Sequence, residues 1–346
     1  MKFKKLGHTN IDVSLICLGT MNMGEQNTQE ESFEQMDYSF EQGINFFDTA
    51  EVYAVPPRRE THGKTEEIIG NWFTKSKKRE KIILATKMVG PGVEWIRNGG
   101  GNYTEKNIAI AVDGSLRRLQ TDYIDLYQLH WPERSTNYFG KRNYEHDSSE
   151  GKWNDLESVL KALKKFVDQG KIKYIGVSNE TPWGLSKFLE VAEQLNLPRI
   201  VSVQNPYNLL NRAYDIGMSE ISCREKVGLL AYSPLAIGYL SGKYRNNQIP
   251  KNSRIGLFGN FWTRYKEDNA KKAVDDYYKL AKENGLTLTQ MSLAFVNSRP
   301  FMTSNIIGAT TMEQLKENIG TADIDLSVEI IEKINLIHSN NPNPTP

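Results

Sequence analysis

Residues 44–53 read INFFDTAEVY, an apolar run followed by a carboxylate and, further on, a tyrosine. Residues 44–48 form a nearly continuous apolar run that ends on Asp48, and Tyr53 follows five residues later. Short runs with apolar residues at consecutive positions are typical of parallel strands that are covered on both faces. The stretch therefore predicts a buried parallel strand that leaves the core on a carboxylate.

Seven other runs along the chain share this character. They are VSLICLG (13–19), KIILATK (81–87), YIDLYQLH (123–130), KYIGVSN (173–179), IVSVQN (200–205), VGLLAYS (227–233) and SNIIGAT (304–310). Each run is bounded by residues that favour turns or helix starts, so the sequence predicts eight strands in all.

Helical periodicity fills the intervals between the runs. In residues 154–171, Asn154 and Glu157 have the spacing of a capping box, and Gly170 marks the end of the helix. Residues 104–120 show the same apolar stripe. Further helices are predicted at 30–42, 64–74, 182–195, 215–225, 270–284, 289–298 and 312–319. Eight strands that alternate with helices predict an α/β fold, a (β/α)8 TIM barrel, rather than an open doubly wound sheet.

The chain is predicted to form one domain. Residues 1–340 make the barrel, with long loops after several strands, and residues 341–346 (NPNPTP) form a loose tail. The opening FKKLGHTNIDV predicts an N-terminal β-hairpin that caps the bottom of the barrel.

The bulk properties exclude several classes of protein. The formal net charge is +1 and the pI about 7.7, so the chain has no basic footprint for nucleic acid or anionic membranes. No apolar stretch approaches the roughly 20 residues of a membrane span, and the basic start has no apolar run behind it. Of the two cysteines, Cys17 stands in a strand-like run and Cys223 in a helix-like segment, which predicts reduced, buried thiols. We therefore expect a cytoplasmic protein.

The sequence indicates neither a metal site nor a Rossmann dinucleotide-binding motif. No two of the five histidines have ligand spacing, and no strand is followed by a G-x-G-x-x-G motif. We expect no metal site.

Polar side chains close most of the predicted strands. They are Asp48, Lys87, His130, Ser178, Asn179, Gln204, Asn205, Tyr232 and Ser233. A barrel brings the carboxyl ends of its strands to one mouth, where the active site of such enzymes lies. The pattern predicts a site there, although a structural ion pair of Asp48 with Lys87 explains part of it equally well.

The pair of Lys87 and Tyr53 gives this site a chemistry. A lysine ammonium about 4 Å from a phenol favours the phenolate by roughly 4 kcal/mol at an effective dielectric constant of about 20. This corresponds to about 3 pK units, which would bring the pKa of Tyr53 near neutral pH. Asp48 would balance the charge of Lys87, and His130 would bind the oxygen that Tyr53 protonates.

These residues stand in motifs that resemble those of the aldo-keto reductases, which are NADPH-dependent carbonyl reductases with a (β/α)8 barrel. The motifs are LGTM (18–21), GINFFDTAEVY (43–53), ATK (85–87), LQTDYIDLYQLHWP (119–132), GKIKYIGVSN (170–179), QNPYNLLNR (204–212), LLAYSPL (229–235), LSGKY (240–244) and IIGATTMEQLKENI (306–319). VPPRRETHGKTE (55–66) is similar to the bacterial Tas-type branch. The resemblance covers nearly the whole chain in order.

The resemblance implies functional roles. The catalytic residues would be Asp48, Tyr53, Lys87 and His130, with hydride transfer from the nicotinamide and proton donation from Tyr53. The residues implied to contact the cofactor are Gly19, Thr20, Met21, Asp48, Ser178, Asn179, Gln204, Tyr232, Ser233, Pro234, Leu235, Ser241, Lys243, Arg254, Gly308, Thr310, Gln314, Glu317 and Asn318. Among them, Ser178, Asn179 and Gln204 would bind the carboxamide, and Tyr232 would stack on the nicotinamide.

The resemblance implies NADPH as the cofactor, with NADH as the weaker alternative. Many relatives carry an arginine or lysine in the turn after the last strand, where this chain offers only Thr310 and Gln314. Arg254 would then help to bind the 2′-phosphate.

The substrate is expected to be a small carbonyl compound that contacts Val52, Trp95 and Trp131, and the protein to be a monomer or weak homo-oligomer. Two alternatives stay open. One is a cofactor-binding regulatory module related to potassium-channel β subunits, and the other is a barrel enzyme that forms a Schiff base on Lys87.

Overall fold

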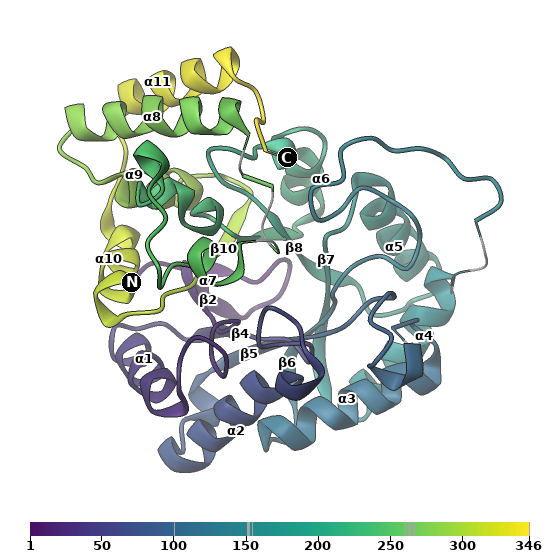
Figure 1. Cartoon of the computed structure of the whole chain (residues 1–346). Helices are drawn as coiled ribbons and strands as arrows, with labels where there is room; N and C mark the ends of the chain where they lie inside the picture. The colour runs from purple at the N-terminus through teal and green to yellow at the C-terminus, as the bar shows by residue number, and fades with distance from the viewer. Residues whose placement is uncertain are drawn as a thin grey trace.

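The computed structural model describes residues 1–99, 101–150, 153, 155–259, 261, 264–265 and 267–345, with Asn98 described through its backbone alone. Eight parallel strands close into a barrel (Figure 1). In order around the barrel they are β10 (Met302–Ile307), β3 (Ile16–Gly19), β4 (Phe46–Asp48), β5 (Ile83–Met88), β6 (Ile124–Leu129), β7 (Ile172–Ser178), β8 (Ile200–Pro206) and β9 (Gly228–Tyr232). The predicted barrel is confirmed.

Helices pack around the outside of the barrel (Figure 1). They are α1 (Gln29–Glu41), α2 (Lys64–Ser76), α3 (Glu105–Leu119), α4 (Leu156–Asp168), α5 (Pro182–Gln194), α6 (Met218–Glu225), α7 (Arg254–Phe258), α8 (Asp268–Glu283), α9 (Leu288–Asn297), α10 (Met312–Gly320) and α11 (Val328–Asn340). Within the described part of the chain, no helix is long and apolar enough to cross a membrane.

Threonine side chains begin five of these helices. Thr28, Thr104, Thr181, Thr287 and Thr311 each accept a hydrogen bond from the backbone N–H three residues further on. This bond satisfies one of the donors that the first helical turn leaves without a partner. The sequence therefore marks these helix starts locally.

The N-terminal hairpin closes the bottom of the barrel, as predicted. Strands β1 (Phe3–Lys5) and β2 (Asp12–Ser14) pair in antiparallel fashion, and the turn between them carries Leu6 into the barrel. Leu6 is fully buried against the apolar interior residues of the strands. Gly7 follows with a φ of +59°, and a Cβ on it would lie 2.2 Å from the Val201 carbonyl oxygen. The close approach of the hairpin to the barrel therefore requires glycine at this position.

Two predicted strand boundaries were wrong. Residues 13–19 do not form one strand, because the chain bends at Leu15, and residues 12–14 belong to the hairpin. The Ser14 hydroxyl donates to the Ile16 carbonyl at 2.6 Å and helps to fix this bend. The last strand ends at Ile307 instead of residue 310, so Gly308 and Thr310 lie in the following loop.

Helix α4 begins one residue later than its predicted cap. The N-cap is Asp155, whose carboxylate accepts from the Ser158 N–H at 2.8 Å, and Asn154 lies outside the described residues. The aspartate can accept this bond with a full negative charge at the positive end of the helix. A single cap by Asp155 therefore takes the place of the capping box that was predicted for Asn154 and Glu157.

The C-terminal region is more ordered than predicted. Helix α11 lies against α8 (Figure 1), although the sequence did not indicate it. Its apolar residues are spread around the helix, and Val328 and Leu336 are exposed, so the apolar stripe is weak. Residues 341–345 were expected to be loose, but Thr345 is fully buried, and its N–H donates to the Leu210 carbonyl at 3.2 Å.

Helices α2 and α3 are in close contact at Gly70. A Cβ on Gly70 would lie 2.3 Å from the Arg118 carbonyl oxygen, which is backbone and unable to move aside easily. The next turn of α2 buries Trp72, whose ring lies 5.5 Å from that of Phe47 on β4. This contact fixes the strand that carries Asp48.

We expect Gly70→Ala to lower the free energy of unfolding by about 1–3 kcal/mol, because the added methyl group separates two packed helices. Gly320→Ala is the matched control, since no atom lies within 4 Å of its added Cβ and the residue is helical. Urea denaturation of both variants measures the difference. Equal stability of the two variants would show that the helix contact tolerates a side chain.

Candidate active site

A polar layer lies above the apolar floor of the barrel. The interior apolar side chains include Cys17, Phe46, Ala85, Leu126, Leu230 and Ile306. Since strand residues alternate between inside and outside, the residues two positions further on also face inward. These are Gly19, Asp48, Lys87, Gln128, Tyr232 and Gly308. Most of the predicted site therefore meets at one end of the barrel.

Lys87 and Asp48 form a buried ion pair in this layer. The Lys87 Nζ lies 2.6 Å from Asp48 Oδ2 and 2.7 Å from the Thr49 carbonyl oxygen. Both side chains are almost completely buried. Burial alone would lower the pKa of Lys87, but Asp48 and Tyr53 outweigh it and raise this pKa. The lysine is therefore an ammonium ion at neutral pH.

Tyr53 is the third partner of Lys87. Its hydroxyl lies 3.5 Å from the Lys87 Nζ, which also lies 4.9 Å from the centre of the phenol ring. The pKa of Tyr53 is raised, because burial disfavours the phenolate more than Lys87 favours it. The expectation of a pKa near neutral was wrong in direction. Asp48 explains much of the difference, since its charge offsets that of Lys87.

The ring of His130 lies next to that of Tyr53. The two rings meet edge to face at a centroid distance of 5.8 Å. Burial, and then the charge of Lys87, lower the pKa of His130 well below its ordinary value, so the imidazole is neutral. The ring nitrogen Nδ1 is buried and has no hydrogen-bond partner among the described residues. A neutral imidazole here has an N–H available for a ligand.

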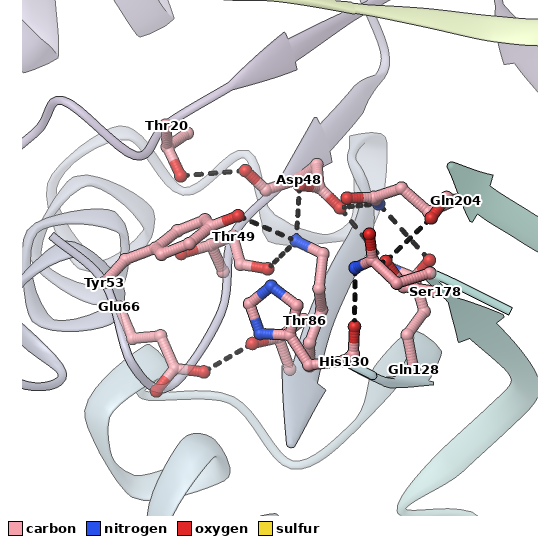
Figure 2. Close-up of polar contacts among 12 residues, drawn as sticks. Thr20, Asp48, Thr49, Tyr53, Glu66, Thr86, Gln128, His130, Ser178 and Gln204 are labelled. Atoms are coloured by element: carbon pink, nitrogen blue, oxygen red, sulfur yellow. Dashed lines mark hydrogen bonds and ion pairs between the residues drawn. The ribbon is translucent and has the colours of Figure 1, made fainter. Parts of the chain in front are cut away.

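Gln128 is a member of the polar layer that the sequence reasoning missed. Its Nε2 donates to Asp48 Oδ1 at 3.3 Å, and Gln204 Nε2 donates to the same oxygen at 2.8 Å (Figure 2). The two amides are also bonded to each other at 3.3 Å. The signal in the sequence was a glutamine within a buried strand, two positions before His130 and hence on the same face.

Ser178, Asn179 and Tyr232 form a connected group beside this layer. The Tyr232 hydroxyl donates to Asn179 Oδ1 at 2.6 Å, and Asn179 Nδ2 donates to the His130 carbonyl at 2.9 Å. The Ser178 hydroxyl donates to the Gln204 carbonyl at 2.7 Å. The predicted carboxamide set is therefore assembled, although its groups bond one another in this structure.

The loop after β9 brings two cations together. Burial, and then the charge of Arg254, lower the pKa of Lys243, so the two side chains lie close to each other. Arg254 also donates to Asn22, a residue that the sequence reasoning missed. Ser241 precedes Lys243 by two residues, and its hydroxyl donates to the Gly238 carbonyl at 2.8 Å. Adjacent cations with nearby hydroxyl and amide groups suit an anionic group such as phosphate.

The predicted contacts after β10 are only partly brought together. The Gln314 side chain accepts from the Thr310 N–H at 3.1 Å, and Asn318 donates to the Gly308 carbonyl at 3.2 Å. Glu317 instead accepts from the Thr287 hydroxyl at 2.7 Å, on an exposed part of the surface. The Glu317 carboxylate is thus bonded to the threonine that begins α9.

The remaining residues that were predicted to contact the cofactor lie just after the ends of β3 and β9. The Thr20 hydroxyl donates to the Asp48 carbonyl at 2.8 Å, and the Met21 carbonyl accepts from the Val55 N–H at 3.0 Å. Ser233 has a φ of +52°, which turns the chain sharply after β9, and Pro234 and Leu235 follow in this turn.

The predicted substrate residues gather beside Tyr53. Val52 and Trp131 are buried in one apolar cluster, and Trp95 packs against it. The Trp131 ring lies 5.0 Å from that of His130. Glu51, which the sequence reasoning missed, accepts from Arg97 through both carboxylate oxygens at 2.7 and 2.8 Å. This buried pair ties the loop after β5 to the loop that carries Tyr53.

A metal centre is not indicated. Among the described residues, no three histidine, cysteine, aspartate or glutamate side chains are arranged to bind a metal ion.

Comparisons with known proteins agree with this geometry. The profile of the aldo/keto reductase family matches residues 15–338. The chain is 46% identical to Protein tas of Escherichia coli (strain K12), over the full length of both. It is 34% identical to the uncharacterized oxidoreductase YrpG of Bacillus subtilis (strain 168), covering 100% of this chain and 98% of that one. An aldo-keto reductase of Babesia bovis is 39% identical over 75% of this chain and 96% of its own length. The chain belongs to the aldo/keto reductase family of oxidoreductases.

Proposed function

We propose that the protein reduces aldehydes or ketones to alcohols with NADPH, and that Tyr53 donates the proton. The observation that carries this proposal is the buried Lys87, which lies between Asp48 and the Tyr53 hydroxyl. A phenol next to a fixed ammonium ion is a suitable proton donor, and His130 and Trp131 lie beside it.

The donor set at the mouth suits a dinucleotide phosphate. Ser178, Asn179 and Gln204 offer amide and hydroxyl groups that match a carboxamide, and Tyr232 offers an aromatic face. Lys243 and Arg254 repel each other, and a bound phosphate would relieve this repulsion. The N-terminus of α10 at Thr311 adds backbone N–H groups that favour an anion. These residues would hold the cofactor.

The bound cofactor supplies the hydride that reduces the carbonyl carbon. Tyr53 donates its hydroxyl proton to the carbonyl oxygen, so the C=O group becomes an alcohol. Lys87 stabilises the phenolate that remains, and it is fixed in direction by Asp48 and the Thr49 carbonyl. His130, as a neutral ring, donates to the same oxygen and orients the substrate.

The raised pKa of Tyr53 agrees with this role. A proton donor must carry its proton before the reaction, and Tyr53 is fully protonated at neutral pH. As negative charge develops on the substrate oxygen, Lys87 favours transfer of the proton.

The geometry disfavours a Schiff base on Lys87. The raised pKa keeps its amine protonated and therefore not nucleophilic. Its ammonium also has three partners, namely Asp48, Thr49 and Tyr53. We expect the protein to act in the cytoplasm as a monomer or weak homo-oligomer.

We expect Tyr53→Phe to lower the rate constant of carbonyl reduction by about 10²–10⁴-fold, because the variant lacks the proton donor. The dissociation constant of NADPH should change less than about threefold, a difference below 1 kcal/mol. Tyr207→Phe is the control, since it removes a buried phenol that bonds Asp215 instead. Stopped-flow measurement of NADPH oxidation with an aromatic aldehyde tests this, and undiminished turnover would assign the proton to another group.

The two cofactors should differ in affinity. At one fixed salt concentration we expect NADPH to bind at least about tenfold more tightly than NADH, since Arg254 gains a charged hydrogen bond. Arg254→Met should reduce this ratio, and Arg58→Met, which removes a surface arginine paired with Glu25, should not. Fluorescence titration gives the constants. Equal affinities in the unaltered protein would end the proposed preference.

The low pKa of His130 predicts a pH dependence of stability. The unfolded state binds a proton on this ring below about pH 6.5, whereas the folded state does not. The stability is therefore complete above this pH and falls by up to about 1.4 kcal/mol per pH unit below it. We expect His130→Asn to remove this part of the slope. Urea denaturation between pH 5 and 7 measures it, and identical slopes would mean that the folded ring takes up a proton.

A further inference from the structure

Arg264 lies on the rim of the mouth, in the loop after β9. A Cβ on Gly140, in the loop after β6, would lie 2.6 Å from the Arg264 Nε, so the two loops touch at this point. The Arg264 side chain also lies close to the Tyr232 hydroxyl, which is at the end of β9. Arg264 is half-buried. The guanidinium therefore joins two long loops to the polar layer.

Two chains of contacts lead from Arg264 to His130. On one side, Tyr232 bonds Asn179, and Asn179 bonds the His130 carbonyl. On the other, Phe139 precedes Gly140 and packs edge to face on Trp131, with ring centroids 5.5 Å apart. The Trp131 ring in turn lies 5.0 Å from that of His130. These contacts thus connect Arg264 to Trp131, one of the predicted substrate residues.

The charge of Arg264 is not balanced by the described part of the chain. Three arginines of the mouth loops have a carboxylate partner: Arg97 pairs with Glu51, Arg134 with Glu180, and Arg58 with Glu25. No carboxylate among the described residues pairs with Arg264. A cation partly removed from water and next to a neutral phenol retains unused donors.

Two further positive charges lie close to Arg264 along the loop after β6. Lys141 and Arg142 follow Gly140 directly and are exposed, and neither pairs with a carboxylate of the described residues. Their positive potential adds to that of Arg264 on the same side of the mouth.

We propose that Arg264 binds the anionic group of the substrate, so that the protein prefers carbonyl compounds that also carry a carboxylate. This inference rests on the proposed reductase function and names its substrate class. A planar guanidinium can bind a carboxylate through two parallel hydrogen bonds, which fixes the orientation of the carbonyl end. Arg264 is connected to Trp131 through Phe139, and to the His130 backbone through Tyr232 and Asn179. This position assigns the anion to the substrate, whereas Lys243 and Arg254 would serve the phosphates of the cofactor.

The test uses two aldehydes that differ only in charge. They are 4-carboxybenzaldehyde and its neutral methyl ester, methyl 4-formylbenzoate. We expect the unaltered protein to favour the acid by about tenfold or more in kcat/KM, and Arg264→Met to abolish this preference. The activity of Arg264→Met toward the ester should stay within about threefold. Arg58→Met is the matched control, because Arg58 is a mouth-loop arginine that Glu25 already neutralises.

Other outcomes overturn the proposal. An unaltered protein without preference for the acid, or an unchanged preference in Arg264→Met, shows that the guanidinium does not contact the substrate. Weakening of NADPH binding with an unchanged preference assigns Arg264 to a cofactor phosphate instead.

A binding measurement separates this inference from the proposed function. Calorimetric titration of benzoate and benzamide into the protein with NADP⁺ needs no turnover. If neither aldehyde is reduced, the proposed function fails, and the titration still decides the role of Arg264. Loss of a benzoate preference in Arg264→Met supports that role, and equal binding of benzoate in both proteins overturns it.

Discussion

The ammonium group of Lys87 is the constraint on which the rest of the mouth depends. It is buried in the barrel, and its charge must be satisfied by Asp48, the Thr49 carbonyl and the Tyr53 hydroxyl. Removing one partner of such a buried pair typically costs about 3–5 kcal/mol, because the other charge is left without compensation. The second oxygen of Asp48 is occupied by amides of Gln128 and Gln204. One charge thus fixes groups from four strands.

The loops around this centre are fixed in a similar way. The buried pair of Glu51 and Arg97 ties the loop after β5 to the Tyr53 loop, and Arg134 pairs with Glu180 between the loops after β6 and β7. Ion pairs of this kind add little net stability, but they penalise every arrangement that separates the charges. The wall formed by Val52 and Trp131 is therefore positioned by charge as well as by apolar packing. This rigidity suits a site in which a proton donor must meet one oxygen.

Much of the barrel and of its centre could be predicted from the sequence, because both follow from local patterns. Apolar runs defined the strands, and polar residues at their ends defined the mouth. Gln128 was missed because a polar residue inside a strand is read as part of the strand unless its neighbours in space are known. Helix α11 has apolar residues on several sides, and the docking of Thr345 depends on Leu210, far away in sequence. The direction of the shift in the Tyr53 pKa depends on whether the effect of burial exceeds that of the Lys87 charge, which Asp48 offsets. This balance cannot be read from residue types.

The hairpin that inserts Leu6 affects how small molecules can reach the polar layer. Below the polar layer the barrel is filled by Leu6, Cys17, Phe46 and Leu126, all fully buried. An apolar interior of this kind offers water molecules no hydrogen-bond partners. In the proposed reaction, protons, substrate and product then enter and leave by the opposite end of the barrel. In that proposed reaction, a group that occupies this end of the barrel also governs how quickly Tyr53 regains its proton.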